Sequence, residues 1–229
     1  MNETPPLRTE FDAHAHRYLK DMEGAIPEAL VEGDYFSRYK VAIMSARTRS
    51  KSPRTILDFG CGIGLALRHM VEYFPSAEIW GYDVSSVSLE QAAKHAPTAQ
   101  LTFAIDDLPT SHFDAIFIAN VLHHIPADAR LAVTLRCREL LAGNGSLFVF
   151  EHNPYNPATR WVFEHCPFDK DAQMLRRHEV IELAKQAGLR VVHKRYTLFF
   201  PKPLSFFRKL EPAMSWLPLG AQYCVELAK

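Results

Sequence analysis

The run Ile56-Leu57-Asp58-Phe59-Gly60-Cys61-Gly62-Ile63-Gly64 constrains the fold of this chain more than any other stretch. Its first residues are apolar, as in a buried strand, and three glycines follow at alternate positions. The segment from Leu65 to about Phe74 then predicts a helix. Glycines in such a turn let the backbone approach a bound small molecule, because no Cβ intervenes. The turn also leaves the first N–H groups of the helix directed at that ligand.

A second apolar strand, 77–82, ends at Asp83, nineteen residues after Gly64. A carboxylate at the tip of the second strand suits the two hydroxyls of a ribose. The alternative role for Asp83 is an N-terminal cap for a helix that starts near Ser85. Together, the turn and the carboxylate predict an adenosine-containing ligand on a Rossmann-like sheet.

The glycine spacing departs from the dinucleotide fingerprint G-x-G-x-x-G, because the third glycine comes one position early and Leu65 stands in its place. Asp58, two residues before the turn, is awkward beside a pyrophosphate but suits a ligand with an ammonium and a sulfonium. On these residues the chain resembles the class I S-adenosylmethionine-dependent methyltransferases, whose first motif is acidic-x-Gly-x-Gly-x-Gly. The resemblance is strong over residues 54–151.

Composition narrows the choice of partners. The 229 residues include 26 basic and 26 acidic side chains, and this zero net charge argues against nucleic acid as the main partner.

The four cysteines are scattered without a C-x-x-C pair, so neither a zinc site nor a disulfide framework is predicted. No metal is expected. No secretory signal or transmembrane segment is recognised, so a soluble cytoplasmic protein is expected. The sequence does not indicate the oligomeric state.

Short apolar runs alternate with helical segments along the middle of the chain. This alternation predicts a parallel sheet covered on both faces. The predicted strands are 55–59, 78–82, 101–105, 115–119, 147–151, 191–200 and 222–228, and the predicted helices are 11–22, 35–50, 65–74, 86–95, 127–142 and 178–187. Gly24, Pro27 and Gly33 fall in the linker between the first two helices. Asn144-Gly145 is predicted to separate the helix 127–142 from the fifth strand, and Gly188 to follow the last helix as its C′ residue.

The resemblance implies an α/β fold with a Rossmann-like, mostly parallel seven-stranded sheet. In this class the seventh strand runs antiparallel between the fifth and the sixth. We therefore expect a single domain over 1–229, with an N-terminal helical cap (1–52), a cofactor-binding core (53–151) and a substrate-side half (152–229).

The same resemblance assigns S-adenosyl-L-methionine as the cofactor and indicates which residues bind it. Asp58 would act on its amino group, the glycines would bring backbone to its methionine part, and Asp83 would bind its ribose. Asp106 with Ile105 is the predicted adenine contact, although Asp106 and Asp107 also fit a solvated loop. The predicted cofactor residues are Asp58, Gly60, Gly62, Gly64, Asp83, Ile105, Asp106 and Asn120.

Three further segments are candidates for the chemistry. His123 or His124, after the fourth strand, could take a proton from the acceptor; in the plainer interpretation one packs on the cofactor and the other caps the helix. His152 and Asn153, at the end of the fifth strand, are predicted to meet substrate. Phe206 and Phe207 belong to an aromatic segment, 199–216. It could cover the active site, receive an apolar substrate, or contact a membrane or partner, or it could pack on the edge of the sheet and the 160s segment.

The predicted function is methyl transfer from S-adenosylmethionine to oxygen, nitrogen or carbon of a small-molecule acceptor. From Glu151 onward, including Cys166-Pro167-Phe168-Asp169, the chain loosely resembles a bacterial subgroup associated with secondary-metabolite or cell-envelope biosynthesis. Two alternatives remain: a non-catalytic S-adenosylmethionine-binding protein, and an NAD-dependent oxidoreductase whose glycine turn accepts a pyrophosphate.

Overall fold

The computed structural model describes residues 33–166 and 169–229. Seven strands form one sheet in the order β3-β2-β1-β4-β5-β7-β6. The strands are β1 (Thr55–Phe59), β2 (Glu78–Tyr82), β3 (Gln100–Thr102), β4 (Phe113–Ala119), β5 (Leu141–His152), β6 (Arg190–Thr197) and β7 (Gln222–Ala228). Strands β1 to β5 pair in parallel, whereas β7 runs antiparallel to both β5 and β6. The predicted sheet with an antiparallel seventh strand is confirmed.

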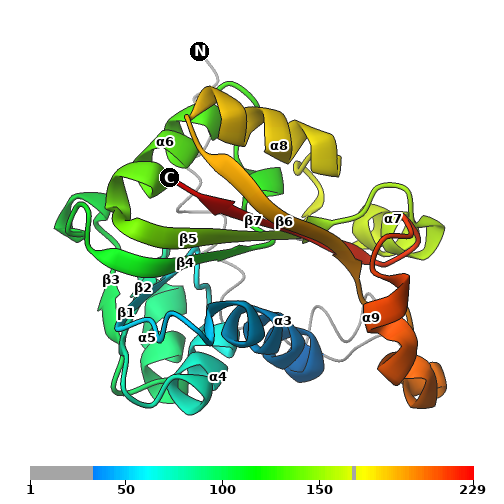
Figure 1. Ribbon diagram of the computed structural model, residues 1–229, viewed down its shortest axis with the longest axis horizontal. Coiled ribbons are helices and arrows are strands. Elements are labelled where there is room, and N and C mark those ends of the chain that lie inside the picture. The colour runs from blue at the N-terminus through cyan, green and yellow to red at the C-terminus, as the bar shows by residue number, and fades with distance from the viewer. Residues whose placement is uncertain (1–32, 167–168) are drawn as a thin grey trace.

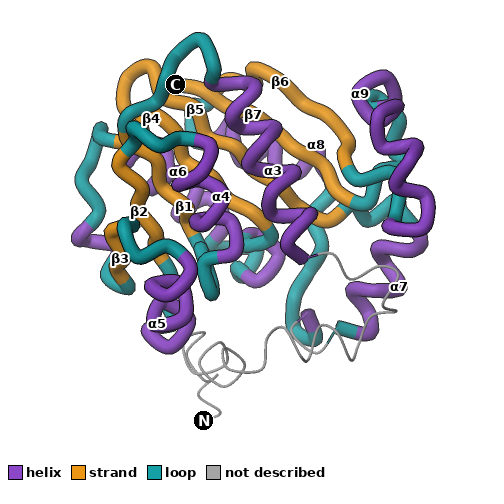
Figure 2. Tube along the Cα trace, turned by 90° about the horizontal axis from the view of Figure 1, so that it is seen from below, coloured by secondary structure: helices purple, strands orange, loops and turns teal. Residues whose placement is uncertain are grey.

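Helices cover both faces of the sheet. Figure 1 shows α3, α4 and α5 on one face and α6 and α8 on the other, and Figure 2 looks onto the first of these faces. The helices are α3 (Gly33–Thr48), α4 (Leu65–Tyr73), α5 (Ser86–His95), α6 (Arg130–Leu140), α7 (Pro157–His165), α8 (Arg177–Gln186) and α9 (Glu211–Met214), with short 3-10 turns η2 (Ile105–Asp107), η3 (Leu122–His124) and η5 (Lys202–Leu210). Within the described ranges, none of the helices is long and apolar enough to cross a membrane.

The central strands supply two cores because neighbouring residues point to opposite faces of a sheet. In β1, Ile56 belongs to the core under α3, α4 and α5, whereas Leu57 belongs to the core under α6 and α8. In β4, Phe117 belongs to the first of these cores and Ile116 to the second. Burial on both faces explains why these strands are apolar at nearly every position, as the sequence indicated.

The third strand is shorter than predicted, and the chain turns directly after it. Thr102 Oγ1 donates to Asp107 Oδ2 at 2.8 Å and accepts from the backbone N–H of Ala104 at 3.0 Å. These side-chain bonds replace the ladder bonds that a longer strand would make. As a result, Ile105 lies in the turn η2 and not in the strand.

The fifth strand begins earlier than predicted, because Asn144-Gly145 lies within it and does not precede it. Leu141 pairs with Phe113 and Ser146 with Ala115, with an irregularity in register between the two pairs. A Cβ on Gly145 would lie 2.7 Å from the carbonyl oxygen of Phe113. Glycine at this position therefore permits a close approach of two backbones inside the sheet, and it does not end the strand.

The predicted helix 11–22 lies outside the described residues. The second predicted helix is present as α3, and it begins at Gly33, which the sequence placed in the linker. Helix α8 is followed by Gly188 at φ 72°, the expected C′ conformation. Helix α7 was not predicted; its N-cap is Asn156, whose side chain accepts from the backbone N–H of Thr159 at 2.9 Å.

Candidate active site

A cavity of about 480 Å³ lies at the carboxyl ends of β1, β2 and β4. This is the point where the strand order reverses, since β1 stands between β2 and β4. Open α/β sheets bind ligands at such a point. The predicted residues that line this cavity are Asp58, Gly60, Gly62, Asp83, Ile105, Asn120 and His124. Gly64, Asp106, His123, His152, Asn153, Phe206 and Phe207 are not among its lining residues.

The three glycines of the turn have different roles. All have positive φ, at 78°, 50° and 83° for Gly60, Gly62 and Gly64. A Cβ on Gly60 would lie 2.5 Å from Val121, and one on Gly64 would lie 2.8 Å from Ala92, so both positions serve close packing. A Cβ on Gly62 would meet no atom within 4 Å. Gly62 is therefore the position where the missing side chain leaves room for a ligand.

Asp83 joins the two loops at the cavity. Its Oδ2 accepts from the backbone N–H of Gly62 at 2.8 Å, and its Oδ1 accepts from that of Ser85 at 2.9 Å. The N-cap of α5 is Ser85 itself, which accepts from the N–H of Ser88. Because each carboxylate oxygen has two lone pairs, Asp83 can hold the glycine turn and still accept hydrogen bonds from a ligand.

An acidic and a basic side chain, Asp58 and Lys40, lie buried at the cavity. Asp58 is buried, and its Oδ2 has no hydrogen-bond partner. Burial and the nearby Asp83 raise the pKa of Asp58 to about 8, against the opposing field of Lys40. Lys40, on α3, lines the same cavity; burial lowers its pKa to about 8, against the fields of Glu151 and Asp58. Lys40 was not predicted from the sequence, although it lies on one helix face with Met44, four residues later.

The loops after β3 and β4 complete the cavity. Ile105 contributes an apolar wall, whereas Asp106 is exposed outside it. Asn120 has a φ of 59°, and its Oδ1 accepts from Gln222 Nε2 at 3.4 Å. Asparagine tolerates this left-handed conformation better than most residues, which accounts for its place at the sharp turn after β4.

The paired histidines have different surroundings, although their ring centroids are only 4.2 Å apart. His123 is 2% exposed, and its Nδ1 lies 2.6 Å from Glu151 Oε2. Burial would lower the pKa of His123, but Glu151 and Asp169 raise it to about 9. His124 reaches the cavity instead; burial and the charge of His123 lower its pKa to about 4. Neither Glu151 nor Asp169 was predicted as a site residue from the sequence, because neither follows a recognisable spacing from the histidines.

The two residues at the end of β5 that were predicted to meet substrate, His152 and Asn153, make contacts within the protein. Asn153 Nδ2 donates to the carbonyls of Pro218 at 3.1 Å and Gly220 at 2.8 Å, so its amide holds the loop before β7. The ring of His152 packs 5.1 Å from that of His123, and burial lowers its pKa to about 3. His152 is therefore a neutral member of the histidine cluster.

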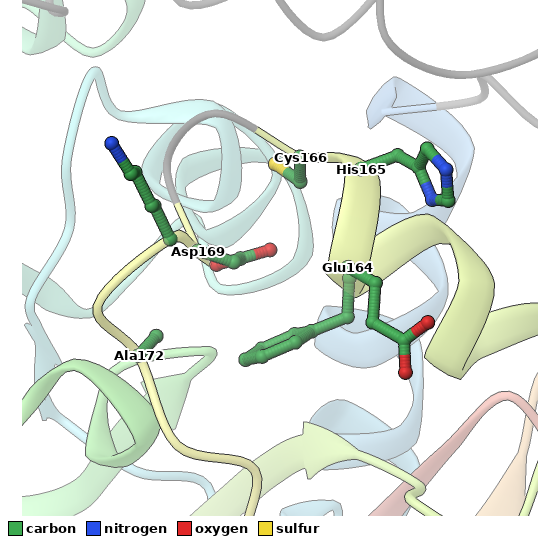
Figure 3. A pocket seen from close by; sticks show the side chains of 7 residues that line it. Glu164, His165, Cys166, Asp169 and Ala172 are labelled. Atoms are coloured by element: carbon green, nitrogen blue, oxygen red, sulfur yellow. The ribbon is translucent and has the colours of Figure 1, made fainter.

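A second cavity, of about 440 Å³, lies between α7 and the loop that follows it. Figure 3 shows the Asp169 carboxylate pointing into this space, whereas the side chains of Glu164 and His165 point away from it. Asp169 Oδ1 lies 3.4 Å from His123 Nε2 and 3.6 Å from His124 Nε2. Asp169 thus connects the second cavity to the histidines beside the first.

The aromatic segment 199–216 forms η5 and α9, at the end of the sheet remote from β3 (Figure 1). It packs against α3, where Tyr39 donates to Glu211 Oε2 at 2.7 Å and Arg208 lies 3.7 Å from the ring centroid of Tyr35. Phe206 is 63% exposed and Phe207 38% exposed, with ring centroids 3.9 Å apart. Neither phenylalanine lines the two cavities described above.

The cavity fits S-adenosylmethionine on three structural grounds. It has an unpartnered buried carboxylate oxygen, a glycine whose missing Cβ leaves space, and a second carboxylate at the end of β2. In addition, residues 57–147 match the family model described as "Methyltransferase domain". Residues 57–147 thus match a methyltransferase domain, and the sheet order is the one expected for the class I S-adenosylmethionine-dependent methyltransferases.

Individual relatives agree with this class. The chain is 36% identical over 112 residues to trans-aconitate 2-methyltransferase of Methylobacterium radiotolerans, a match that covers 47% of this chain and 42% of the relative. The chain thus spans less than half the length of that curated relative. Magnesium protoporphyrin IX methyltransferase of Synechocystis, solved with S-adenosylhomocysteine bound, has the same fold (TM-score 0.64, 14% identity, 97% of each chain covered). A TehB-like methyltransferase of Corynebacterium glutamicum gives a TM-score of 0.60 at 17% identity, covering 95% of this chain and 98% of that one.

Proposed function

We propose that this protein transfers a methyl group from S-adenosylmethionine to a small-molecule acceptor. The observation that carries the proposal is the Asp58 carboxylate, which is buried at the cavity with an unpartnered oxygen. A buried carboxylate in that state is costly unless a ligand satisfies it. The methyl donor supplies the needed cation, since its methionine end carries an ammonium group.

The remaining lining residues have roles that follow from their positions. Asp83 would accept the ribose hydroxyls, the backbone at Gly60 and Gly62 would approach the methionine part, and Lys40 would pair with its carboxylate. Ile105 offers an apolar surface for adenine. Asp106 stays a prediction as an adenine contact, because its exposed side chain would have to turn toward the cavity.

S-adenosylmethionine supplies a methyl group on a sulfonium, which is already a good leaving group. The chain then has to align the acceptor with that methyl and keep water out. Of the two candidate bases, His124 reaches the cavity, but with a pKa of about 4 it is a weak proton acceptor. We therefore propose that alignment contributes more to the rate than a histidine base does.

The acceptor is the least constrained part of the proposal. The curated relative described above is named for trans-aconitate, an acid, and this supports a screen that begins with small carboxylic acids. Oxygen, nitrogen and carbon acceptors remain alternatives.

Two measurements test the proposal. Calorimetry with S-adenosylhomocysteine and with NAD separates a methyltransferase from an oxidoreductase: binding of the first without the second is expected, and the reverse would overturn the proposal. An acceptor screen that measures release of S-adenosylhomocysteine then separates an enzyme from a protein that only binds the cofactor. Binding without turnover for any acceptor would favour the latter.

Asp83→Ala should weaken S-adenosylhomocysteine binding by about 1.5–3 kcal/mol, the cost of lost charge-assisted hydrogen bonds. The change also removes the acceptor for the Gly62 N–H, so the turn should loosen as well. Asp128→Ala is the matched control, because Asp128 is exposed and does not line the cavity. An unchanged calorimetric affinity for the Asp83 variant would rule out the ribose assignment.

Cofactor binding at pH 7 should release roughly one proton. With a pKa of about 8, Asp58 is mostly neutral at pH 7 in the free protein, and it must ionise beside an ammonium. Lys40, with a pKa also of about 8, is already mostly protonated at that pH, so it takes up only a small fraction of a proton when the cofactor binds. The apparent affinity should therefore rise as the pH rises from 6 toward 8. Calorimetry in buffers of different ionisation enthalpy measures the release, which Asp58→Asn should remove.

Phe206→Ser should change the free energy of unfolding by no more than about 0.5 kcal/mol, because the ring is mainly in solvent. If Phe206 and Phe207 contact the acceptor, as we propose, turnover or acceptor preference changes while the melting temperature stays near wild type. A large drop in melting temperature would instead show that the segment is a packing element. Thermal melts combined with the acceptor screen distinguish the two.

A further inference from the structure

Three histidines and two carboxylates gather at the carboxyl ends of β4 and β5, beside the cofactor cavity. They come from three segments: the turn η3 gives His123 and His124, the end of β5 gives Glu151 and His152, and the loop after α7 gives Asp169. The His123 and Glu151 side chains are each only 1% exposed. Of the five, only His124 lines the cofactor cavity, and the methyl-transfer scheme above requires none of them as a base.

Two of the distances within this cluster are close to those between neighbouring ligands of one metal ion. His123 Nε2 and His124 Nε2 lie 3.4 Å and 3.6 Å from Asp169 Oδ1, and the three atoms all lie within 4.8 Å of one another. Hydrogen bonds from N–H to oxygen have their usual range at about 2.7–3.2 Å. In a tetrahedral zinc site with bonds of about 2.0–2.1 Å, neighbouring ligand atoms lie roughly 3.3–3.4 Å apart.

Glu151 orients one of these ligands. It accepts from His123 Nδ1 at 2.6 Å, and it is held in turn by the backbone N–H groups of Leu122 at 2.8 Å and Val121 at 3.1 Å. A carboxylate that binds one ring nitrogen leaves the other, Nε2, directed at Asp169. Histidines that bind metals are oriented in this way by a carboxylate on their second nitrogen.

The charges also balance with a divalent cation. When both imidazoles bind a metal ion as neutral ligands, Glu151 and Asp169 contribute two negative charges in a place largely removed from water. A divalent ion cancels them. The ion would lie between the two cavities, since His124 lines the one of about 480 Å³ and Asp169 lines the one of about 440 Å³.

We propose that His123 Nε2, His124 Nε2 and Asp169 Oδ1 bind a divalent transition-metal ion, with zinc as the ion that fits. Two imidazoles and one carboxylate form a three-ligand set that leaves a fourth position open for water or a ligand oxygen. The sequence shows no metal-binding motif, because Asp169 lies far along the chain from the histidine pair. This proposal does not depend on methyl transfer.

Metal uptake by the full chain tests the proposal without cofactor or acceptor. The chain is produced without a polyhistidine tag, treated with a chelator, dialysed, and titrated with Zn²⁺ or Co²⁺. We expect one ion per chain at micromolar or lower free metal, and a Co²⁺ visible spectrum typical of four-coordinate sites. Absence of stoichiometric uptake would overturn the proposal and leave a hydrogen-bonded cluster around a protonated His123.

Variants establish where the ion binds. Asp169→Asn and His124→Gln should each weaken Zn²⁺ binding at least about tenfold, with circular dichroism near wild type. His165→Gln is the matched control, because His165 lines the second cavity but points away from it (Figure 3). If the wild type and the three variants take up equal amounts of Zn²⁺, or if the His165 variant loses as much Zn²⁺ affinity as the other two, the ion is bound by scattered histidines. Either result would overturn the assignment. A Zn²⁺-dependent rise in melting temperature, absent in the Asp169 variant, gives a second measurement.

Discussion

Replacing Gly62 by valine should abolish binding of S-adenosylmethionine and S-adenosylhomocysteine while the fold is kept. The missing Cβ of Gly62 faces open space in the cavity, so a branched side chain would fit the free protein and fill the room that the cofactor needs. Its φ of 50° adds strain of about 1–2 kcal/mol, which a stable domain tolerates. We expect affinity to fall at least about a thousandfold, a loss of roughly 4 kcal/mol.

Gly143 provides the control for that experiment. A Cβ there would also meet no atom within 4 Å, and the residue does not line the cavity. Gly143→Val should therefore bind S-adenosylhomocysteine as the wild type does. Calorimetry and circular dichroism on both variants measure binding and fold separately. Normal affinity in the Gly62 variant would mean that the glycine turn is not the binding site.

Glu151→Ala should lower the free energy of unfolding by about 3–5 kcal/mol, the largest stability effect that we expect for a polar residue of the site. Glu151 is fully buried and accepts from two backbone N–H groups and from His123. Burial opposes its ionisation, but His123 and the Leu122 N–H lower the pKa of Glu151. Truncation leaves those donors, and the charge on His123, without a partner.

Urea unfolding measures this effect, and Glu139→Ala is its control. Glu139 is exposed on α6, where Arg136 lies 3.2 Å away, and loss of such a surface pair costs within about 1 kcal/mol. The loss in free energy of unfolding for Glu151→Gln should lie between those for Glu151→Ala and Glu139→Ala, because the amide keeps an acceptor oxygen for the backbone. A loss below about 1 kcal/mol for Glu151→Ala would contradict the role of this carboxylate as the centre of the histidine cluster.

Much of the sheet was predictable because its signals are local. Apolar runs, the glycine turn and helix 86–95 each depend on residues close together in sequence, and α5 and β7 have the predicted bounds. The exceptions depend on distant partners. Gly145 looked like a helix breaker because nothing nearby in the sequence shows the Phe113 carbonyl that approaches it.

The sequence by itself determined the class of fold, the glycine turn at Gly60–Gly64 and the acidic residues Asp58 and Asp83 that line the cavity. Tertiary structure alone decided which glycine faces open space in the cavity, that Lys40 lies near Asp58, and that Asp169 meets the histidine pair. The physical reason is sequence separation. A turn is specified by the conformational needs of adjacent residues, whereas charges and ligands from α3, η3 and the loop after α7 meet only when the helices pack on the sheet.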